Sequence, residues 1–139
     1  MEVRFTVFGD PHGKGRHRTG KGREYTPEKT VLYENLVKTE YQRQSRVRFP
    51  DEAMLDVRIF AYYAIPKSVS KKKRQAMLDH KIRPTKKPDA DNVCKVICDS
   101  LNKIAYRDDT QIVDCMVRKF YSDRPRVVVS IRECGGEIA

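Results

Sequence analysis

Apolar residues recur at two different periods along this chain. Residues 3–7 and 55–63 alternate apolar and polar side chains, a pattern that predicts two strands. Residues 111–121 and 126–132 are predicted to form two more, the last because of its run of β-branched valines. We therefore expect four strands.

Two other stretches place apolar residues at helical spacing. The first helix is predicted to have Thr26 as its N-cap and Pro27 at its first helical position. Its apolar residues, expected to face the core, are Val31, Leu32, Leu36, Val37 and Tyr41. The second helix is predicted from about Ala90 or Asp91 to Leu101, with an apolar face beside a charged one.

The order strand, helix, strand, helical insert, helix, strand, strand predicts an α+β (mixed α/β) fold, a small mixed sheet packed with two main helices. A length of 139 residues fits one domain, 1–139. No apolar run approaches the roughly 18 residues that span a bilayer, and the N-terminus begins with a strand pattern rather than a signal peptide. We expect no membrane partner and a cytoplasmic location.

Charge points to a polyanionic partner. The chain has 29 Lys+Arg against 19 Asp+Glu, a net charge of +10, which favours nucleic acid through counterion release. The cations expected to contact DNA are Lys14, Arg16, Arg18, Lys71, Lys72, Lys73, Arg74, Lys86 and Lys87.

Most of these cations fall in a glycine-rich loop, 9–24, and a basic insert, 66–86. Glycines let the loop backbone approach phosphates, but the loop lacks the Gly-Lys-Ser/Thr ending of a P-loop, which argues against an NTPase or a nucleotide cofactor. In the insert, Ser68 or Ser70 is predicted to cap a short helix. Its run 71–74 is either a solvated face or a DNA contact.

Four cysteines occur, at positions 94, 98, 115 and 134. They could pair or bind zinc, but Cys94 and Cys98 lie four apart in a helical pattern and no C-x-x-C occurs. We interpret them as small buried thiols in a reducing compartment, with structural zinc the less favoured alternative.

Acids gather in one part of this basic chain, residues 87–111. Asp89 and Asp91 stand at the predicted start of the second helix, and Asp108 and Asp109 in a turn expected to fold back over that start. Three or four carboxylates without histidine favour Mg²⁺, with Mn²⁺ as a substitute, acting on a phosphodiester. Lys95, one helical turn beyond Asp91, would neutralise phosphate charge.

A structural interpretation of the same acids stays open. Asp89 and Asp91 would merely cap the helix, and the Asp91–Lys95 and Lys95–Asp99 pairs would be surface ion pairs worth about 0.3–0.5 kcal/mol each. Spacing alone does not separate a metal site from capping.

The segment Lys87-Pro88-Asp89-Ala90-Asp91-Asn92-x-x-Lys95, followed by Asp99-Ser100-Leu101 and Tyr106-x-Asp108-Asp109-x-Gln111-Ile112, closely resembles the RusA family of Holliday junction resolvases. The resemblance extends to the basic N-terminal loop. It implies a single RusA-like domain of a homodimer, found in bacteria and their phages, that cuts four-way junction DNA by paired symmetric nicks with Mg²⁺ or Mn²⁺ and acts in DNA recombination and repair.

The resemblance also implies roles for the acidic residues. Asp89, Asp91 and Asp109 match the family's metal-binding catalytic carboxylates, and Lys95 its catalytic lysine. Asp108 matches the first acid of the Asp-Asp pair and is either a further ligand or a turn residue. Asp99 is expected to support the ligands rather than bind metal.

Two alternatives to a junction resolvase stay open. One is a nuclease for flaps, forks or other branched DNA. The other is a non-catalytic protein that binds structured DNA and uses its acids only to cap a helix.

Overall fold

A mixed four-stranded sheet is the centre of the fold. The computed structural model describes residues 1–15, 18–20, 23–25 and 27–135, with the backbone alone for 18–20 and 23–25. The sheet has the order β1-β6-β4-β5. Its strands are β1 (Glu2–Phe8), β4 (Leu55–Ala64), β5 (Ile112–Ser122) and β6 (Arg126–Glu133). β6 pairs antiparallel with β1 and β4, whereas β4 and β5 are parallel.

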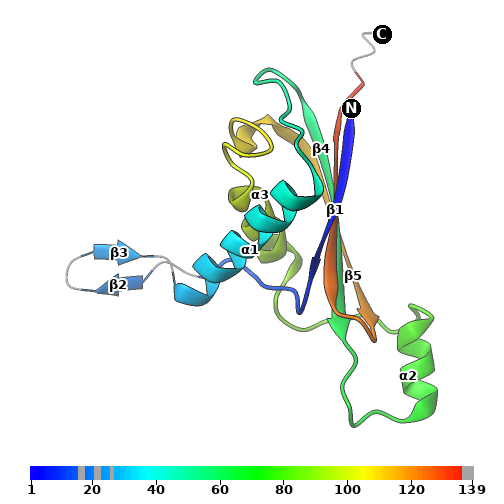
Figure 1. Ribbon diagram of the computed structural model, residues 1–139. Helices are drawn as coiled ribbons and strands as arrows, with labels where there is room; N and C mark the ends of the chain where they lie inside the picture. Colours follow the sequence, from blue (N-terminus) through cyan, green and yellow to red (C-terminus); the bar gives the residue numbers. More distant parts are fainter. Residues whose placement is uncertain (16–17, 21–22, 26, 136–139) are drawn as a thin grey trace.

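The described residues form three helices, of which two make a layer on one face of this sheet (Figure 1). The helices are α1 (Glu28–Gln44), α2 (Lys71–Leu78) and α3 (Ala90–Ser100), followed by a short 3₁₀ turn, η1 (Asp109–Gln111). α1 packs against α3 and β1, and α3 packs against β5, as Figure 1 shows. α2 lies apart from this layer, near β5. The α+β fold class predicted from the element order is confirmed.

The hydrophobic core lies between the sheet and the α1–α3 layer. Alternate residues of β1, β4 and β6 face it, and α3 contributes Val93, Val96 and Ile97, each with 0% of its surface exposed. The strands and α3 therefore follow the predicted periods closely.

α1 buries only part of the face that was predicted: Val37 and Tyr41 lie in the core as expected. Thr30, Tyr33, Val37 and Tyr41 are buried, at a spacing of three to four residues. Among the residues expected in the core, Leu32 is 61% exposed, and Val31 and Leu36 are each 40% exposed. The prediction is wrong for these three residues because Thr30 and Tyr33 take the buried positions beside Val37 and Tyr41. The helix also begins one residue later, with Pro27 as its N-cap.

The predicted loop 9–24 contains a small hairpin. β2 (Arg18–Gly20) and β3 (Arg23–Tyr25) pair antiparallel as a separate two-stranded sheet. Strands of three residues are too short to show alternation in the sequence, which is why the pattern predicted only a loop. Figure 1 shows this hairpin projecting beyond the start of α1.

Candidate active site

Asp89 stands at the start of α3 and is the N-cap of the helix, with the extended backbone angles typical of that position. Its own side chain makes no capping bond and is exposed, and Asn92 Nδ2 donates to Asp89 Oδ1 at 2.5 Å. The Tyr63 hydroxyl donates to the Pro88 carbonyl oxygen. The end of β4 therefore holds the segment that positions the Asp89 carboxylate.

The charged face predicted for α3 exists and faces solvent. Lys95 Nζ lies 3.3 Å from Asp91 Oδ2, and the two side chains are 58% and 74% exposed. Asp99, one turn further, is also partly exposed. Because the apolar residues of α3 are packed on the sheet, these three side chains form a stripe open to a large ligand.

Asp109 joins this stripe from a different element. Its carboxyl lies within hydrogen-bonding reach of the Asp99 carboxyl, and partial burial together with that neighbour raises the pKa of Asp109. Two carboxylates in contact repel each other unless a proton or a cation lies between them. The sequence placed the Asp108–Asp109 turn over the first turn of α3; the structure places Asp109 beside the last turn instead.

Asp108 has a structural role in that turn. Its Oδ2 accepts a hydrogen bond from the Thr110 amide at 3.1 Å and caps η1, while the Gln111 side chain completes a capping box. The bond to Thr110 also lowers the pKa of the Asp108 carboxyl. Of the two roles that the sequence left open, these contacts favour that of a turn residue.

Lys14 ties the N-terminal loop to the site. Its Nζ lies 3.2 Å from Asp99 Oδ2 and 3.1 Å from Glu34 Oε2 of α1. Burial alone would lower the pKa of Lys14, but the hydrogen bonds to both carboxylates outweigh it and raise the value. Lys14 is therefore a counter-cation within the site, and a contact between it and DNA stays a prediction.

Two of the loop glycines, Gly13 and Gly15, lie close against the helices. A Cβ at Gly15 would lie 2.6 Å from Thr30 Oγ1, and one at Gly13 would lie 3.0 Å from Asn92 Cβ. The Gly15 amide donates to Thr30 Oγ1 at 2.9 Å. The loop therefore presses against α1 and α3, which holds Lys14 in place.

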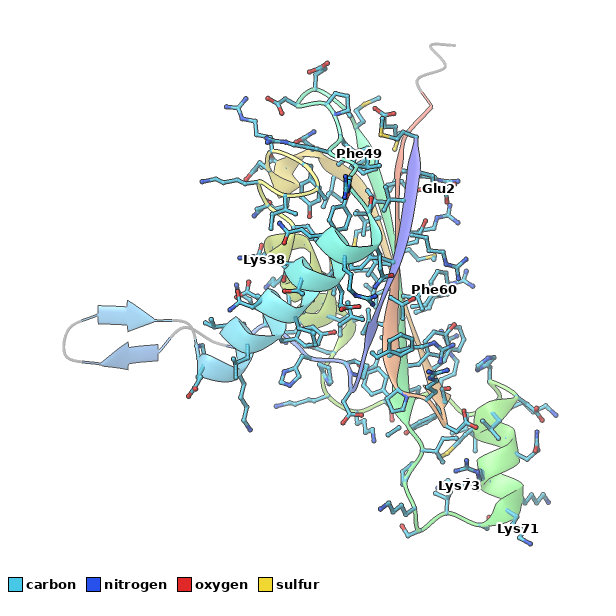
Figure 2. The ribbon with its side chains drawn as sticks, in the orientation of Figure 1. Glu2, Lys38, Phe49, Phe60, Lys71 and Lys73 are labelled. Carbon is cyan, nitrogen blue, oxygen red and sulfur yellow. The ribbon has the colours of Figure 1, made fainter. Side chains whose placement is uncertain are left out.

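The other cations expected at DNA differ in what the structure describes. Arg16 lies outside the described residues, and only the backbone of Arg18 is described. Ser70 caps α2 by accepting from the Lys73 amide, and residues 71–74 are exposed. Lys71 and Lys73 point outward in Figure 2. None of residues 71–74 forms a salt bridge with another described side chain.

Sequence reasoning missed two residues near Asp89. Lys119 of β5 donates to the Lys86 carbonyl oxygen at 2.7 Å and lies 4.9 Å from the centre of the Tyr63 ring. Burial lowers the pKa of Lys119, opposed by the charge of Asp89, and burial raises the pKa of Tyr63 to about 12. Only the strand register signals their place, because Tyr63 pairs with Tyr121, two residues from Lys119.

The carboxylates fit a hard divalent cation in kind. Asp89, Asp91 and Asp109 supply oxygen ligands near one solvent-exposed helix, and the Asp99–Asp109 contact is a place where added positive charge relieves repulsion. In the described part of the chain, the three proposed ligands do not all lie within 4.8 Å of one another. The carboxylates are therefore of the right chemical kind for Mg²⁺ or Mn²⁺, although their oxygen atoms are too far apart to bind one ion together in this structure.

The cysteines are not uniformly buried, contrary to the prediction. Cys98 is buried, Cys94 and Cys134 are partly exposed, and Cys115 is exposed. Cys94, Cys98 and Cys115 gather where α3 meets β5. Sequence reasoning missed this cluster because Cys115 is distant in sequence and comes next to Cys94 only through the packing of α3 on the sheet.

Comparison with known proteins decides the family. Residues 9–132 match the family described as Endodeoxyribonuclease RusA, which covers the loop, the insert and the acidic segment. The chain belongs to the RusA family. The resemblance noted in the sequence is thereby confirmed, and the RusA family consists of endodeoxyribonucleases, hydrolases that cut DNA.

A curated relative is similar over nearly the whole chain. It is the "Uncharacterized protein YqaN" of Bacillus subtilis (strain 168), 40% identical over 140 residues, with 94% of this chain and 96% of the relative covered. Among the described residues of this RusA-family chain, no helix is long and apolar enough to cross a membrane.

Proposed function

We propose that this chain is a Mg²⁺-dependent endonuclease that resolves Holliday junctions by paired, symmetric hydrolysis of phosphodiester bonds. The observation that supports the proposal best is the exposed stripe of Asp91, Lys95 and Asp99 on α3, joined by Asp109 from η1, in a protein of net charge +10 that belongs to the RusA family. Such carboxylates could bind a divalent cation that in turn binds the phosphates of a DNA substrate.

Asp89, Asp91 and Asp109 are the residues we propose as metal ligands. A bound Mg²⁺, or Mn²⁺ in its place, would activate the attacking water and stabilise charge on the leaving oxygen. Asp99 is a positioning residue, since it contacts both Asp109 and Lys14. Asp108 keeps its capping role in the turn and is not assigned as a ligand.

Lys95 is the proposed cationic catalytic residue. Its ammonium group is exposed and lies 3.3 Å from the carboxylate of Asp91, which is one helical turn earlier on α3. A phosphodiester bound at the acids would therefore lie within reach of the lysine, whose positive charge would stabilise the pentacovalent transition state. Asp91 in turn limits the motion of the lysine side chain.

DNA is proposed to extend from this stripe toward α2. The exposed cations at residues 71–74, together with Lys86 and Lys87, would contact the phosphate backbone on the side of the site nearest β5. The loop 9–24 would contact DNA near α1. Contacts of this kind position the substrate and carry no sequence information themselves.

Paired nicks require two active sites on one junction. We therefore propose a homodimer of the single RusA-like domain, 1–139, which works in the cytoplasm of a bacterium on DNA recombination or repair intermediates of the host or a phage.

The test is a cleavage assay with a synthetic four-way junction and a matched linear duplex, in Mg²⁺. The wild-type chain should nick two opposed junction strands at symmetric positions and leave the duplex intact. Asp91→Asn should bind the junction and cut at least about 100-fold more slowly. Asp123→Asn, at an exposed aspartate in the β5–β6 turn, is the control and should cut normally.

Pairing is measured with a supercoiled plasmid that extrudes a cruciform. Two coordinated cuts release linear DNA, whereas a single nick relaxes the cruciform and leaves a nicked circle. Equal cutting of flaps or forks would point to a broader branched-DNA nuclease. Junction binding without any cut in Mg²⁺ or Mn²⁺ would refute the catalytic proposal and leave a structure-specific DNA-binding protein.

A further inference from the structure

Three thiols meet at the contact between α3 and β5. Cys94 and Cys98 are one turn apart on α3, with their sulfur atoms 3.9 Å from each other. Cys115 of β5 places its sulfur 2.8 Å from that of Cys94. All three sulfur atoms lie within 4.8 Å of one another. Among the described residues, this is the group of three or more potential metal ligands found at this spacing.

The spacing is close to that of a thiolate zinc site. With Zn–S bonds of about 2.3 Å in tetrahedral geometry, pairs of sulfur atoms are about 3.8 Å apart. The Cys94–Cys98 distance already matches that value. The Cys94–Cys115 distance would open by about 1 Å, which a small rotation of the exposed Cys115 side chain allows.

The surroundings suit a cation with one open position. Cys98 is buried, Cys94 is partly exposed and Cys115 is exposed, so the cluster reaches from the core to solvent. Asp56, whose charge acts on Cys115, is already paired with Arg132 at 2.9 Å. Three protein sulfurs and a water molecule would therefore complete a four-coordinate ion.

Sulfur donors select a different metal from the oxygen donors on the same helix. Thiolates are soft ligands that favour Zn²⁺, whereas the carboxylates of Asp89, Asp91 and Asp109 favour Mg²⁺ or Mn²⁺. Hence the two kinds of site can be occupied independently. The inference does not depend on DNA cleavage.

We infer that Cys94, Cys98 and Cys115 form a zinc site that joins α3 to β5. Binding replaces the thiol protons by the metal ion, and the protons pass to solvent, so the affinity for zinc falls as the pH is lowered. The site would tie the helix that bears Asp91, Lys95 and Asp99 to the sheet, since its sulfurs come from both elements.

Cobalt is the spectroscopic probe for this site. The reduced, metal-free full chain is titrated with Co²⁺ in the presence of excess Mg²⁺, which occupies carboxylates but leaves thiolates free. We expect one equivalent of Co²⁺ per chain, with sulfur-to-cobalt charge-transfer absorption and the d–d bands of a tetrahedral site. One equivalent of Zn²⁺ should then abolish both.

Serine variants distinguish the cluster from other binding. Cys94→Ser and Cys115→Ser should each weaken Co²⁺ binding at least tenfold, whereas Cys134→Ser, outside the cluster, should bind like the wild type. Cys115 is exposed, so its variant should keep the wild-type circular dichroism and metal-free melting temperature. Zn²⁺ should raise the melting temperature of the wild type and of Cys134→Ser only.

Three outcomes would overturn the inference. If the wild-type protein shows no sulfur-to-cobalt absorption, the three cysteines do not bind the metal. Unchanged binding in a correctly folded Cys115→Ser variant would place the metal elsewhere. A Cys94–Cys115 disulfide formed without reductant, in protein whose reduced form binds no Co²⁺, would leave an oxidisable thiol pair in place of a zinc site.

Discussion

Replacing Asp109 by asparagine should make the protein more stable and should slow its cleavage of DNA. Its carboxyl contacts that of Asp99, and both are partly exposed. Two unit charges about 4 Å apart repel by about 1 kcal/mol in water. Lys14, 3.2 Å from Asp99, offsets part of this repulsion, so Asp109→Asn should gain between about 0.5 and 1 kcal/mol at neutral pH.

The gain should depend on pH in a defined direction. The pKa of Asp109 is raised in the folded state, so the folded protein binds the proton more tightly than the unfolded one. Ionisation of Asp109 therefore destabilises the wild type as the pH rises from the pKa of the unfolded state through that of the folded state. Asp109→Asn should be the more stable protein at pH 7, and its advantage should disappear as the pH falls through the carboxyl range.

Thermal unfolding at several pH values measures this effect. A gain of that size corresponds to a rise of about 2–4 °C in melting temperature at pH 7. Mg²⁺ should narrow the difference, since it relieves the same repulsion in the wild type. Cleavage of a four-way junction should fall at least about 100-fold. A variant less stable than the wild type at pH 7, or one that cuts normally, would refute the reasoning.

Three further predictions concern the supports of the site and the DNA contact. Lys14→Met should lower the free energy of unfolding by about 1 kcal/mol and should slow cleavage, because Glu34 and Asp99 lose their shared cation. The control Lys38→Met on α1 should change neither. Alanine at each of residues 71–74 should reduce the salt dependence of junction binding by a slope of roughly one per lost phosphate contact, and an unchanged slope would remove α2 from the interface. Tyr63→Phe loses the hydrogen bond to the Pro88 carbonyl, so its free energy of unfolding in chemical denaturation should fall by about 0.5–1.5 kcal/mol. The variant should cut more slowly and bind DNA as tightly as the wild type. A change of the same size in Tyr62→Phe would contradict this.

Periodicity in the sequence predicted most of the fold. It predicted the four strands of the main sheet, the extended entry to α3 at Asp89 and the cap of α2 at Ser70. Each of these features follows from a pattern that spans only about ten residues. The acidic segment 87–111 also identified the family before any contact was known. All of these are local properties of the chain, which is why they are visible without a structure.

Tertiary structure decided which side chains meet. Whether α1 buries Tyr33 or Leu32 depends on the shape of the space beneath it, and the aliphatic pattern alone misplaced Leu32 in the core. Asp109 reaches Asp99 rather than the start of α3 because the turn after the helix returns beside its last residues. Lys14 lies 85 residues before Asp99 in sequence, and only loop packing brings them together.

The sequence by itself thus determined the elements of the main sheet and its helices, the charge and the family, since each depends on residue type and short spacing. The tertiary structure alone decided the pairing of Lys14 with two acids, the contact of Asp99 with Asp109, and the gathering of three cysteines from α3 and β5. These contacts depend on how α3 docks on the sheet, and docking is set by long-range packing that no short stretch of sequence contains.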